Sequence, residues 1–385
     1  MTLIELVRKN LFRKPLRTIL TVFAIFIAFA IFGVLATFQN AMNAGIDTAG
    51  ADRLIVTNKI NFTLQMPIAY VQRTRGVEGV KIVTHADWFG GYYQDPRIFF
   101  AAIAVEPASY LDIYPEYLLP PAQRQAFISD RTALLAGETV AKQFGWKVGD
   151  RIPLKSNIFQ QKNGSDAWDF TLVGIIKGET ARVDTNFVIF QYEYFKETRS
   201  FGGDTIGWMI VKTQSPKDNA NVMKAVDVMF ANSPFETETQ TEQAFAKAFL
   251  EQAGDLGFII SAVVGAAFAT ILLIVGNTMM LTVRERTNEI AVMKTIGFTS
   301  QRIFGLVIGE SLLLTVIGGA LGLLVAWLLS FALQNATGGA FGPMTFTPGI
   351  AIWSVVLMAM LGLLTGLIPA LRAMRINVVT ALGRK

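Results

Sequence analysis

Few side chains in this sequence have the types and spacing that covalent, redox or metal chemistry requires. The 385 residues include no cysteine and one histidine, His85, which excludes disulfides, thiolate zinc sites and multi-histidine metal sites. His85 and Asp87 could serve a serine hydrolase, but no G-x-S-x-G elbow accompanies them. The nucleotide-binding pattern G-x-x-x-x-G-K-[ST] is also absent. We therefore expect a structural role for His85, and no enzymatic activity, metal or cofactor in this chain.

The segment from Arg284 to Gly297, RERTNEIAVMKTIG, has the strongest pattern for a partner-binding element. Arg286 and Glu289 are three residues apart, the spacing of an ion pair on one helix face, and the final glycine suits a helix C-cap. Its apolar residues are predicted to follow one side of the same helix: Ile290, Met293 and Ile296. The pattern alone fits a docking helix and a solvated connector equally well.

Four long stretches of the chain are apolar and uncharged, as membrane-spanning helices are. The sequence is 52% hydrophobic and 16% charged, whereas soluble domains carry about 25% charged residues. The predicted spans cover residues 18–38, 256–283, 303–333 and 350–371, with a short loop at 334–349. A cleaved signal peptide competes with the first span, but an apolar run of this length exceeds the roughly 7 to 15 residues of an h-region. An uncleaved helix is therefore favoured.

Lysine and arginine residues gather at the ends of these spans, in residues 1–17, 284–302 and 372–385. Such groups stay in the cytoplasm, so we expect both termini there and residues 39–255 outside. That outer segment has 21 basic and 25 acidic residues, and the rest of the chain has 13 and 4. The net charge of +5 thus reflects topology and gives no support to nucleic-acid binding. Residues 1–17 are expected to form an amphipathic helix on membrane lipid, or a charged flank that only sets orientation.

The outer segment alternates short strand and helix patterns, which predicts a mixed α+β domain. Two lobes are expected, one from about residues 45–100 plus 201–240 and one from 101–200. Thr132 to Phe144 is predicted to be a helix of the second lobe. The sequence therefore predicts a membrane protein with four transmembrane α-helices and a large α+β extracytoplasmic domain inserted between helices one and two.

Residues 242–255 are predicted to form a stalk that joins this domain to the second span. Phe245, Ala248 and Phe249 have helical spacing, and no proline interrupts the segment. A continuous helix here could transmit a displacement across the membrane surface. The alternative is a surface helix that ends at Gly254.

Small and acidic residues in the last spans have separate predicted roles. Glycines four residues apart permit close helix approach, and the pairs are Gly305 and Gly309, Gly318 and Gly322, and Gly362 and Gly366. About twenty residues of mostly apolar type follow Glu310, which places this acid at the cytoplasmic membrane boundary. We expect Glu310 to be a structural anchor, with a proton-relay role as the alternative.

The run RERTNEIAVMKTIGFTSQRIFGLVIGESLLL resembles the core motif of the ABC permease superfamily that includes macrolide-exporter, lipoprotein-release and cell-division permeases. The resemblance extends to RKNLFRKPLRTILTVFAI, to TALLAGETVAKQFGWKVGDRIPL and to IPALRAMRINVVTAL, in the same order along the chain. Asn377 departs from the proline found in many relatives. The core motif matches at Glu285, Arg286, Glu289, Ile290, Lys294, Gly297 and Glu310.

The resemblance implies a permease of the bacterial inner membrane that dimerises with a second copy or a homologous permease. A separate ABC ATPase would bind ATP and Mg²⁺, and a periplasmic adaptor and outer-membrane channel are optional further partners. The residues implied to couple to the ATPase are Arg284, Glu285, Arg286, Glu289, Ile290, Met293, Lys294 and Gly297. Export or membrane extraction of an amphipathic compound, peptide or lipoprotein is the first hypothesis. The second is a transmitter that activates a cell-wall hydrolase, and the third is a receptor without an ATPase.

Overall fold

The computed structural model describes residues 14–180, 182–252, 256–336 and 344–378. The chain divides into two compact units, a helical unit and an α+β unit. The helical unit contains residues 1–40, 255–333 and 344–385, and the α+β unit contains residues 41–254 and 334–343. Each unit is described by itself, beginning with the helices.

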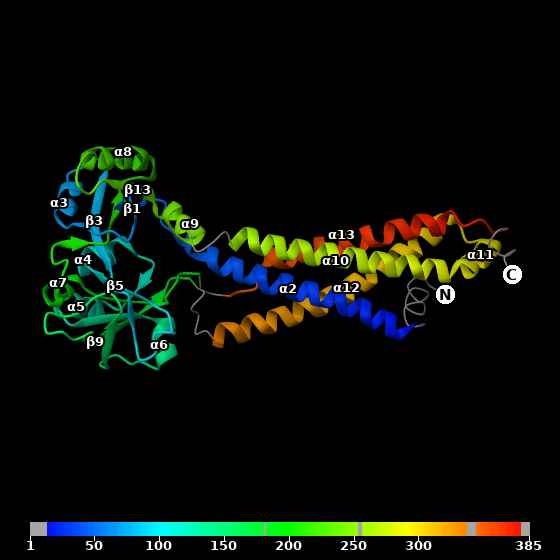
Figure 1. Ribbon diagram of the computed structural model, residues 1–385, viewed down its shortest axis with the longest axis horizontal. Helices are drawn as coiled ribbons and strands as arrows, with labels where there is room; N and C mark the ends of the chain where they lie inside the picture. Colours follow the sequence, from blue (N-terminus) through cyan, green and yellow to red (C-terminus); the bar gives the residue numbers. More distant parts are fainter. Residues whose placement is uncertain (1–13, 181, 253–255, 337–343, 379–385) are drawn as a thin grey trace. The chain divides into compact units, whose positions relative to one another are not determined.

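In the described part of the helical unit there are four long helices and one short helix (Figure 1). They are α2 (Pro15–Thr48), α10 (Leu256–Glu285), α11 (Thr287–Thr295), α12 (Ser300–Ala336) and α13 (Pro348–Met374). All except α11 are long and apolar enough to cross a membrane, which confirms the four predicted spans. The predicted amphipathic helix over residues 1–17 lies largely outside the described residues, and its last three residues open α2.

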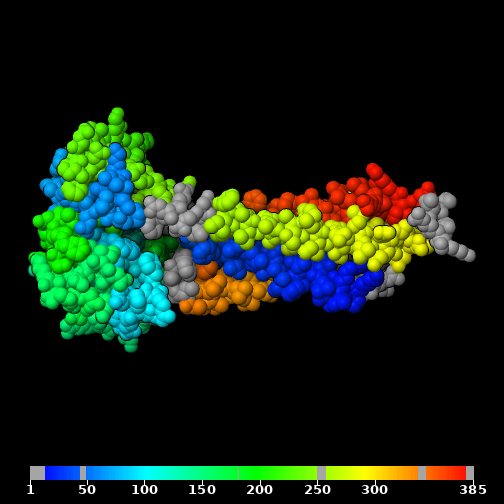
Figure 2. Space-filling view, in the orientation of Figure 1, coloured from blue at the N-terminus to red at the C-terminus, as the bar shows by residue number. Residues whose placement is uncertain are grey.

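The membrane helices pack around a core to which all four contribute. Ile25 and Phe29 of α2, Val275 of α10, Leu314 of α12 and Leu361 of α13 are buried in one cluster. In Figure 2 the surface of α10 lies between the surfaces of α2 and α13. Apolar side chains cover the outer surfaces of the helices as well, and a helix that is hydrophobic all round is expected where lipid replaces water.

The α+β unit is built from short elements. Its strands are β1 (Arg53–Asn58), β2 (Met66–Pro67), β3 (Val80–Trp88), β4 (Gly91–Tyr92), β5 (Ala101–Val105), β6 (Tyr117–Leu118), β7 (Ala133–Gly137), β8 (Arg151–Ser156), β9 (Ala167–Gly178), β10 (Phe187–Gln191), β11 (Thr205–Ile206), β12 (Trp208–Thr213) and β13 (Thr237–Thr241). Its helices are α3 (Ala69–Arg75), α4 (Pro107–Ile113), α5 (Pro121–Ser129), α6 (Glu138–Phe144), α7 (Tyr192–Thr198), η1 (Pro216–Asp218), α8 (Asn219–Phe230) and α9 (Glu242–Gln252).

One mixed sheet runs through both predicted lobes. The strand order is β13-β1-β12-β3-β5-β10-β7-β9-β8-β4, with β6 paired to β9. The first four strands come from the segments 45–100 and 201–241, and the next five come from 101–200. The last strand, β4, departs from the predicted division, because it belongs to 45–100 but pairs with β8 of the second lobe. The predicted division therefore falls between β3 and β5, which pair antiparallel through Ala86 and Val105. The lobes share a continuous backbone hydrogen-bond network at this point.

Helices cover both faces of the sheet. On β1, Leu54 and Val56 point into the cluster that contains residues of α3, α6, α7 and α8, whereas Ile55 points into the cluster that contains residues of α4 and α5. Strands buried on both faces become continuous apolar runs in the sequence, without the alternation of a half-exposed strand.

The predicted helix from Thr132 to Phe144 is wrong in its first half. Residues 133–137 form the central strand β7, and only residues 138–144 form helix α6. All five β7 residues are buried because β7 lies between β10 and β9. A short run such as ALLAG has no period-2 pattern when both faces are covered, so the sequence alone cannot distinguish it from a buried helix.

The predicted stalk begins as a helix in the structure. Helix α9 starts at Glu242 and is described to Gln252, and α10 starts at Leu256. Residues 253–255 lie outside the described residues. The continuity of the stalk with the second span therefore stays a prediction.

Candidate coupling site

The segment predicted to dock a partner is a short helix that follows α10 almost without a break. Helix α10 ends at Glu285, Arg286 is the N-cap residue of α11, and its N–H still donates to the carbonyl of Thr282 at 3.1 Å. At the other end Gly297 has φ of +98°, a value that favours glycine. The N–H of Phe298 donates to the carbonyl of Met293 and that of Gly297 to Lys294. This is a Schellman ending, so the predicted glycine cap is confirmed.

Arg286 joins the start of α11 to helix α12. Its Nη1 donates to Oε1 of Glu310 on α12 at 2.7 Å, and its Nε donates to Oε2 of Glu289 at 3.3 Å. The i,i+3 pair with Glu289 is thus present as predicted, and Glu310 has a partner 24 residues away. Glu310 is buried. Because an uncompensated buried charge is costly, Arg286 and Glu310 fix the start of α11 against α12.

Glu285 ties the beginning of α2 to the end of α10. Its Oε2 accepts from Arg17 Nη1 at 2.8 Å and lies 2.9 Å from Lys14 Nζ. A cavity of about 280 Å³ opens beside these groups, and its lining includes Glu285, Arg286, Glu289 and Glu310. Basic and acidic side chains are balanced in this lining, so the cavity has no strong preference for either sign of charge.

Lys294 anchors the end of α11 to the last helix. Its Nζ donates to the carbonyl oxygens of Met374 and Ile376, both at 2.8 Å. Met374 is the final residue of α13. A lysine at this place satisfies carbonyls that the helix leaves open and complements the negative end of its dipole. Helix α11 is therefore fastened at its start through Arg286 and at its end through Lys294.

Two family descriptions together match nearly the whole chain. Residues 18–228 match the MacB-like periplasmic core domain, and residues 257–378 match the FtsX-like permease C-terminal domain. The chain belongs to the MacB/FtsX family of ABC transporter permeases.

Individual relatives of this permease agree with the assignment. It is 27% identical over 237 residues to the ABC transporter permease YtrF of Bacillus subtilis, which covers 57% of this chain and 53% of that protein. It is 32% identical over 124 residues to the macrolide export ATP-binding/permease protein MacB of Vibrio parahaemolyticus, covering 31% of this chain and 19% of that one. The match thus spans about half or less of these two relatives. The uncharacterized ABC transporter permease MJ1507 of Methanocaldococcus jannaschii is 22% identical over 97% of this chain and 96% of its own.

The permease exposes one face of α11 and buries the other. Ile290 is buried in the core and Met293 packs against it. Val292 and Ile296 are exposed, so the prediction that Ile296 shares a side with Ile290 is wrong. The reason is helix geometry, because at about 100° per residue an offset of six residues places Ile296 about 120° around the helix from Ile290. The Ile296 N–H still donates to the carbonyl of Val292 at 3.1 Å. We call the exposed residues Asn288, Val292, Thr295 and Ile296 the α11 face.

Two of the three predicted glycine pairs make close helix contacts. A Cβ added at Gly318 would lie 2.8 Å from Cβ of Ile25, and one at Gly322 would lie 2.5 Å from the carbonyl oxygen of Phe26. Both contacts belong to the crossing of α12 with α2. Gly362 and Gly366 approach α12 in the same way, against Leu312, Thr315 and Ser311. Gly305 has no neighbour within 4 Å of such a Cβ, and Gly309 is half-buried.

In the α+β unit, Glu242 fixes the root of α9, which we call the stalk root. Its Oε2 accepts from Arg53 Nε at 2.6 Å and from the Gly50 N–H at 2.9 Å, and its Oε1 accepts from the Tyr114 hydroxyl at 2.9 Å. Arg53 also pairs with Glu116 at 2.6 Å. Burial by itself lowers the pKa of Arg53, but the hydrogen bond to Glu116 and the charge of Glu242 raise it above its ordinary value. Sequence reasoning missed this site because its members are up to 192 residues apart.

His85 and Asp87 make separate contacts and do not form a catalytic pair. The Asp87 carboxylate pairs with Arg199, Nη1 to Oδ2 at 2.5 Å, and neither ring nitrogen of His85 has a hydrogen-bond partner among the described residues. The His85 ring packs edge-on against Tyr192, with centroids 4.6 Å apart. Within the described parts of the chain, no group of three or more His, Asp or Glu side chains could hold a metal ion.

Proposed function

We propose that this permease is the membrane subunit of a bacterial ABC transporter that exports an amphipathic compound, peptide or lipoprotein, or extracts it from the membrane. A separate ATPase subunit would bind ATP and Mg²⁺ and dock on the α11 face. The observation that carries the proposal is that α11 presents two exposed apolar residues, Val292 and Ile296, while both of its ends are fastened to other helices. An exposed apolar patch on a braced helix suits a protein contact.

The fastening suggests how a push on α11 would spread. A displacement of α11 reaches α12 through Arg286 and Glu310, α13 through Lys294, and α2 through Glu285. Packed helices move as rigid bodies because interiors are densely filled. We propose that ATP-driven closure of the ATPase shifts these helices and that α9 passes the movement to the outer domain. Substrate would be collected outside the membrane and would not pass between the helices.

One comparison favours a separate ATPase. The ABC transporter permease MJ1507 matches 97% of this chain and 96% of its own length. The assembly would contain a second permease, either another copy or a homologue. Its site would be the inner membrane, with both termini in the cytoplasm. A periplasmic adaptor and an outer-membrane channel would extend the system.

The absence of cysteine makes the docking proposal testable with single introduced thiols. Val292→Cys and Ile296→Cys place a thiol on the α11 face, and Val148→Cys places one on an exposed residue of the α+β unit as the matched control. Each variant is cross-linked in native membranes and its partners are identified by mass spectrometry. We expect an ABC ATPase on the first two variants only. The proposal would be overturned if Val148→Cys cross-linked to the ATPase as strongly as the two α11 variants did. It would also be overturned if the α11 variants cross-linked to a wall hydrolase or to no ATPase.

The same variants test the orientation. A membrane-impermeant maleimide is added to intact spheroplasts and again after lysis. We expect labelling of Val148→Cys before lysis and of Val292→Cys only after it. The reverse order would contradict a cytoplasmic α11.

A further inference from the structure

The α+β unit contains an apolar cavity of about 710 Å³ that the coupling proposal does not use. Its back wall comes from three neighbouring strands, through Trp88 of β3, Ile103 of β5 and Trp208 of β12. Phe245 of α9 forms another side. The remaining lining residues are Thr57, Phe62, Thr63, Leu64, Gln65, Asp87, Ile158, Phe159, Phe201 and Gly207. Cavities of roughly 300 to 1,000 Å³ with mostly apolar and aromatic walls are typical of small-molecule sites.

Among the described residues of the lining, Asp87 has the only charged side chain, and the protein already neutralises it. Asp87 pairs with Arg199 at 2.5 Å, and Gln65 Nε2 donates to both of its carboxylate oxygens at 3.1 and 3.0 Å. Both members of the ion pair are buried. A charged group of a ligand would therefore lose its water and find no counter-ion that is not engaged.

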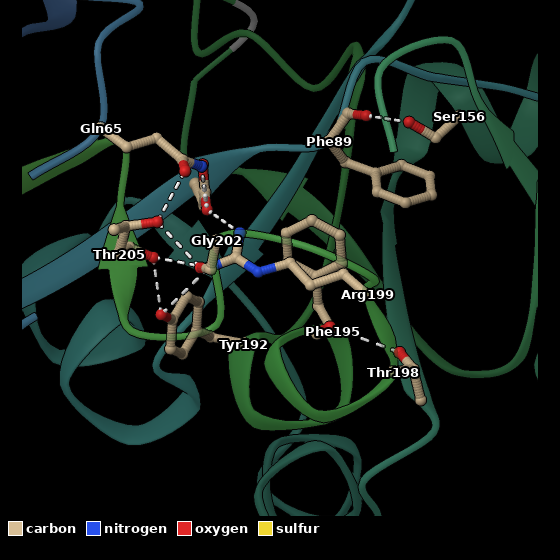
Figure 3. Close-up of polar contacts among 10 residues, drawn as sticks. Gln65, Phe89, Ser156, Tyr192, Phe195, Thr198, Arg199, Gly202 and Thr205 are labelled. Atoms are coloured by element: carbon tan, nitrogen blue, oxygen red, sulfur yellow. Dashed lines mark hydrogen bonds and ion pairs between the residues drawn. The ribbon is translucent and has the colours of Figure 1, made fainter. Parts of the chain in front are cut away.

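The partners of Arg199 hold this ion pair in place. The Arg199 guanidinium donates through Nη2 to the carbonyls of Gly202 and Thr205, the latter at 2.7 Å (Figure 3). The Thr205 hydroxyl in turn donates to Oε1 of Gln65 at 2.6 Å. Gln65 is thus oriented with its amide nitrogen toward Asp87. The floor of the cavity is a preorganised, electrically neutral surface.

The rim of the cavity is apolar and open. Leu64, Ile158 and Phe201 are all exposed, and they lie on loops between β1 and β2, β8 and β9, and α7 and β11. Three large apolar side chains that are exposed and also line one cavity differ from the single exposed apolar residues found on most surfaces. Thr63, also exposed, is a polar residue of the same lining. An apolar group could enter without crossing a charged barrier.

We propose that this cavity binds the uncharged apolar part of an amphipathic small molecule. The size, the six aromatic or indole side chains and the neutral floor all favour such a ligand over a charged or strongly polar one. The polar part of the ligand would remain at the open rim. The proposal names a substrate class for the transport function proposed above and rests on that function for its biological role.

A ligand in this cavity would touch the stalk helix. Phe245 belongs to α9, and its ring packs edge-on against Phe62 with centroids 6.2 Å apart. Both rings line the cavity. Occupancy would therefore change the packing of α9 one turn after the stalk root at Glu242. The cavity is placed to report a bound molecule to the element that leads to the second span.

Photolabelling of the full-length permease in lipid nanodiscs tests the cavity. The probe is adamantyl diazirine, an uncharged apolar photoreagent, and labelled positions are mapped by mass spectrometry. Ile158→Trp and Thr63→Trp each fill the cavity from an exposed position, and Ile60→Trp is the matched control at an exposed residue outside the lining. We expect labelling of the lining residues to fall at least about fivefold in both filling variants and to stay unchanged in the control.

Competition defines the ligand class. Decanol, decanoate and decyltrimethylammonium share one alkyl chain and differ in charge. We expect decanol to suppress cavity labelling at a concentration at least about tenfold lower than either ion. The proposal would be overturned if the lining peptides of the parent protein were labelled no more strongly than those of Ile158→Trp. Equal suppression of the labelling by all three compounds would also overturn it. The labelling needs no ATPase, so its failure is distinguishable from failure of α11 docking, which the cysteine cross-links measure separately.

Discussion

The stalk root and the start of α11 each contain a cluster of ion pairs, and the two clusters differ in how far their side chains are buried. In each, one arginine lies between two carboxylates. At the stalk root the side chains of Arg53, Glu116 and Glu242 are 5%, 16% and 15% exposed. At α11 the Arg286 and Glu310 side chains are 17% and 5% exposed, but that of Glu289 is 44% exposed. We call the stalk root the closed cluster, because both of its carboxylates are largely buried. We call the cluster at α11 the half-open cluster, because Glu310 is buried and Glu289 is partly exposed.

This difference indicates different mechanical roles. A closed cluster with short contacts on both sides has no low-energy alternative arrangement, because separating any member strands a buried charge. It joins α9 to the sheet as a rigid connection. In the half-open cluster the Glu289 arm is longer, 3.3 Å against 2.7 Å for the Glu310 arm. A partner could draw Glu289 outward while Glu310 keeps Arg286 in place.

The largest expected effect comes from opening the closed cluster. Arg53→Met removes the cation from between Glu116 and Glu242, and we expect a loss of about 3 to 5 kcal/mol in the stability of the α+β unit, the usual result of removing one partner of a buried ion pair. Thermal unfolding of the full-length protein followed by circular dichroism measures it. Lys59→Met is the control, since its pair with Glu236 is exposed and little change is expected. Similar melting of the two variants would contradict a closed stalk root.

The second effect concerns the buried ion pair of Arg199 and Asp87 and the buried histidine His85. Burial raises the pKa of Asp87 from 3.8 to about 6 despite Arg199, and burial lowers the pKa of His85 from 6.5 to about 4. The folded state holds the Asp87 proton more tightly than the unfolded state does. The Asp87 contribution therefore lowers the stability of the protein as the pH rises from about 4 to 6. The folded state holds the His85 proton less tightly than the unfolded state does. The His85 contribution therefore raises the stability of the protein over nearly the same pH interval. The two contributions oppose each other.

Replacing His85 should remove the His85 contribution and leave the opposing Asp87 contribution uncompensated. We expect the stability of His85→Leu relative to the parent to fall by roughly 3 kcal/mol between pH 4 and 6.5, at about 1.36 kcal/mol for each pKa unit. Melting temperatures of the two proteins across this range give the difference, in which the other titrating groups cancel. Asp87→Asn should show the opposite trend. A difference that does not depend on pH would contradict these pKa directions.

Local patterns predicted the local half of these clusters and not the distant half. The Arg286–Glu289 pair follows from a spacing of three residues, and the glycine cap follows from the residue type at the end of a helix. Glu310 was recognised as a boundary acid, but its partner could not be identified because helix packing brings Arg286 to it across 24 residues. Lys294 was assigned to the coupling segment, while its contacts to Met374 and Ile376 depend on where α13 ends.

The same limit applied to the fold. Charge-free runs identified the four spans because lipid imposes one condition on every residue of a span. In the α+β unit, the sequence does not distinguish β7 from a helix, and no sequence pattern predicts the cavity. Its lining comes from residues between Thr57 and Phe245 on strands, loops and α9. No local pattern marks such residues, since each looks like an ordinary core aromatic or aliphatic residue.

The third effect acts on the open arm at α11. Glu289→Lys reverses the charge beside Arg286 on the partly exposed side, and we expect stimulation of the partner ATPase by the permease to fall about tenfold, or about 1.4 kcal/mol. Insertion and melting temperature should change little. Glu138→Lys, which makes the same charge reversal at a partly exposed residue of the α+β unit, is the control. Full stimulation in Glu289→Lys would show that the open arm is not part of the coupling contact.

The smallest effect separates fastening from docking at the other end of α11. Lys294→Met keeps the apolar stem but removes the ammonium that donates to Met374 and Ile376. We expect a loss of about 1 kcal/mol or less, the usual size of a charged side chain at a helix C-terminus, measured as a small decrease in melting temperature. Lys294→Arg restores a cation and should recover most of it if Lys294 acts as a fastener. If instead ATPase stimulation collapses in Lys294→Met at unchanged melting temperature, Lys294 contacts the partner directly, and the α11 face extends to this residue.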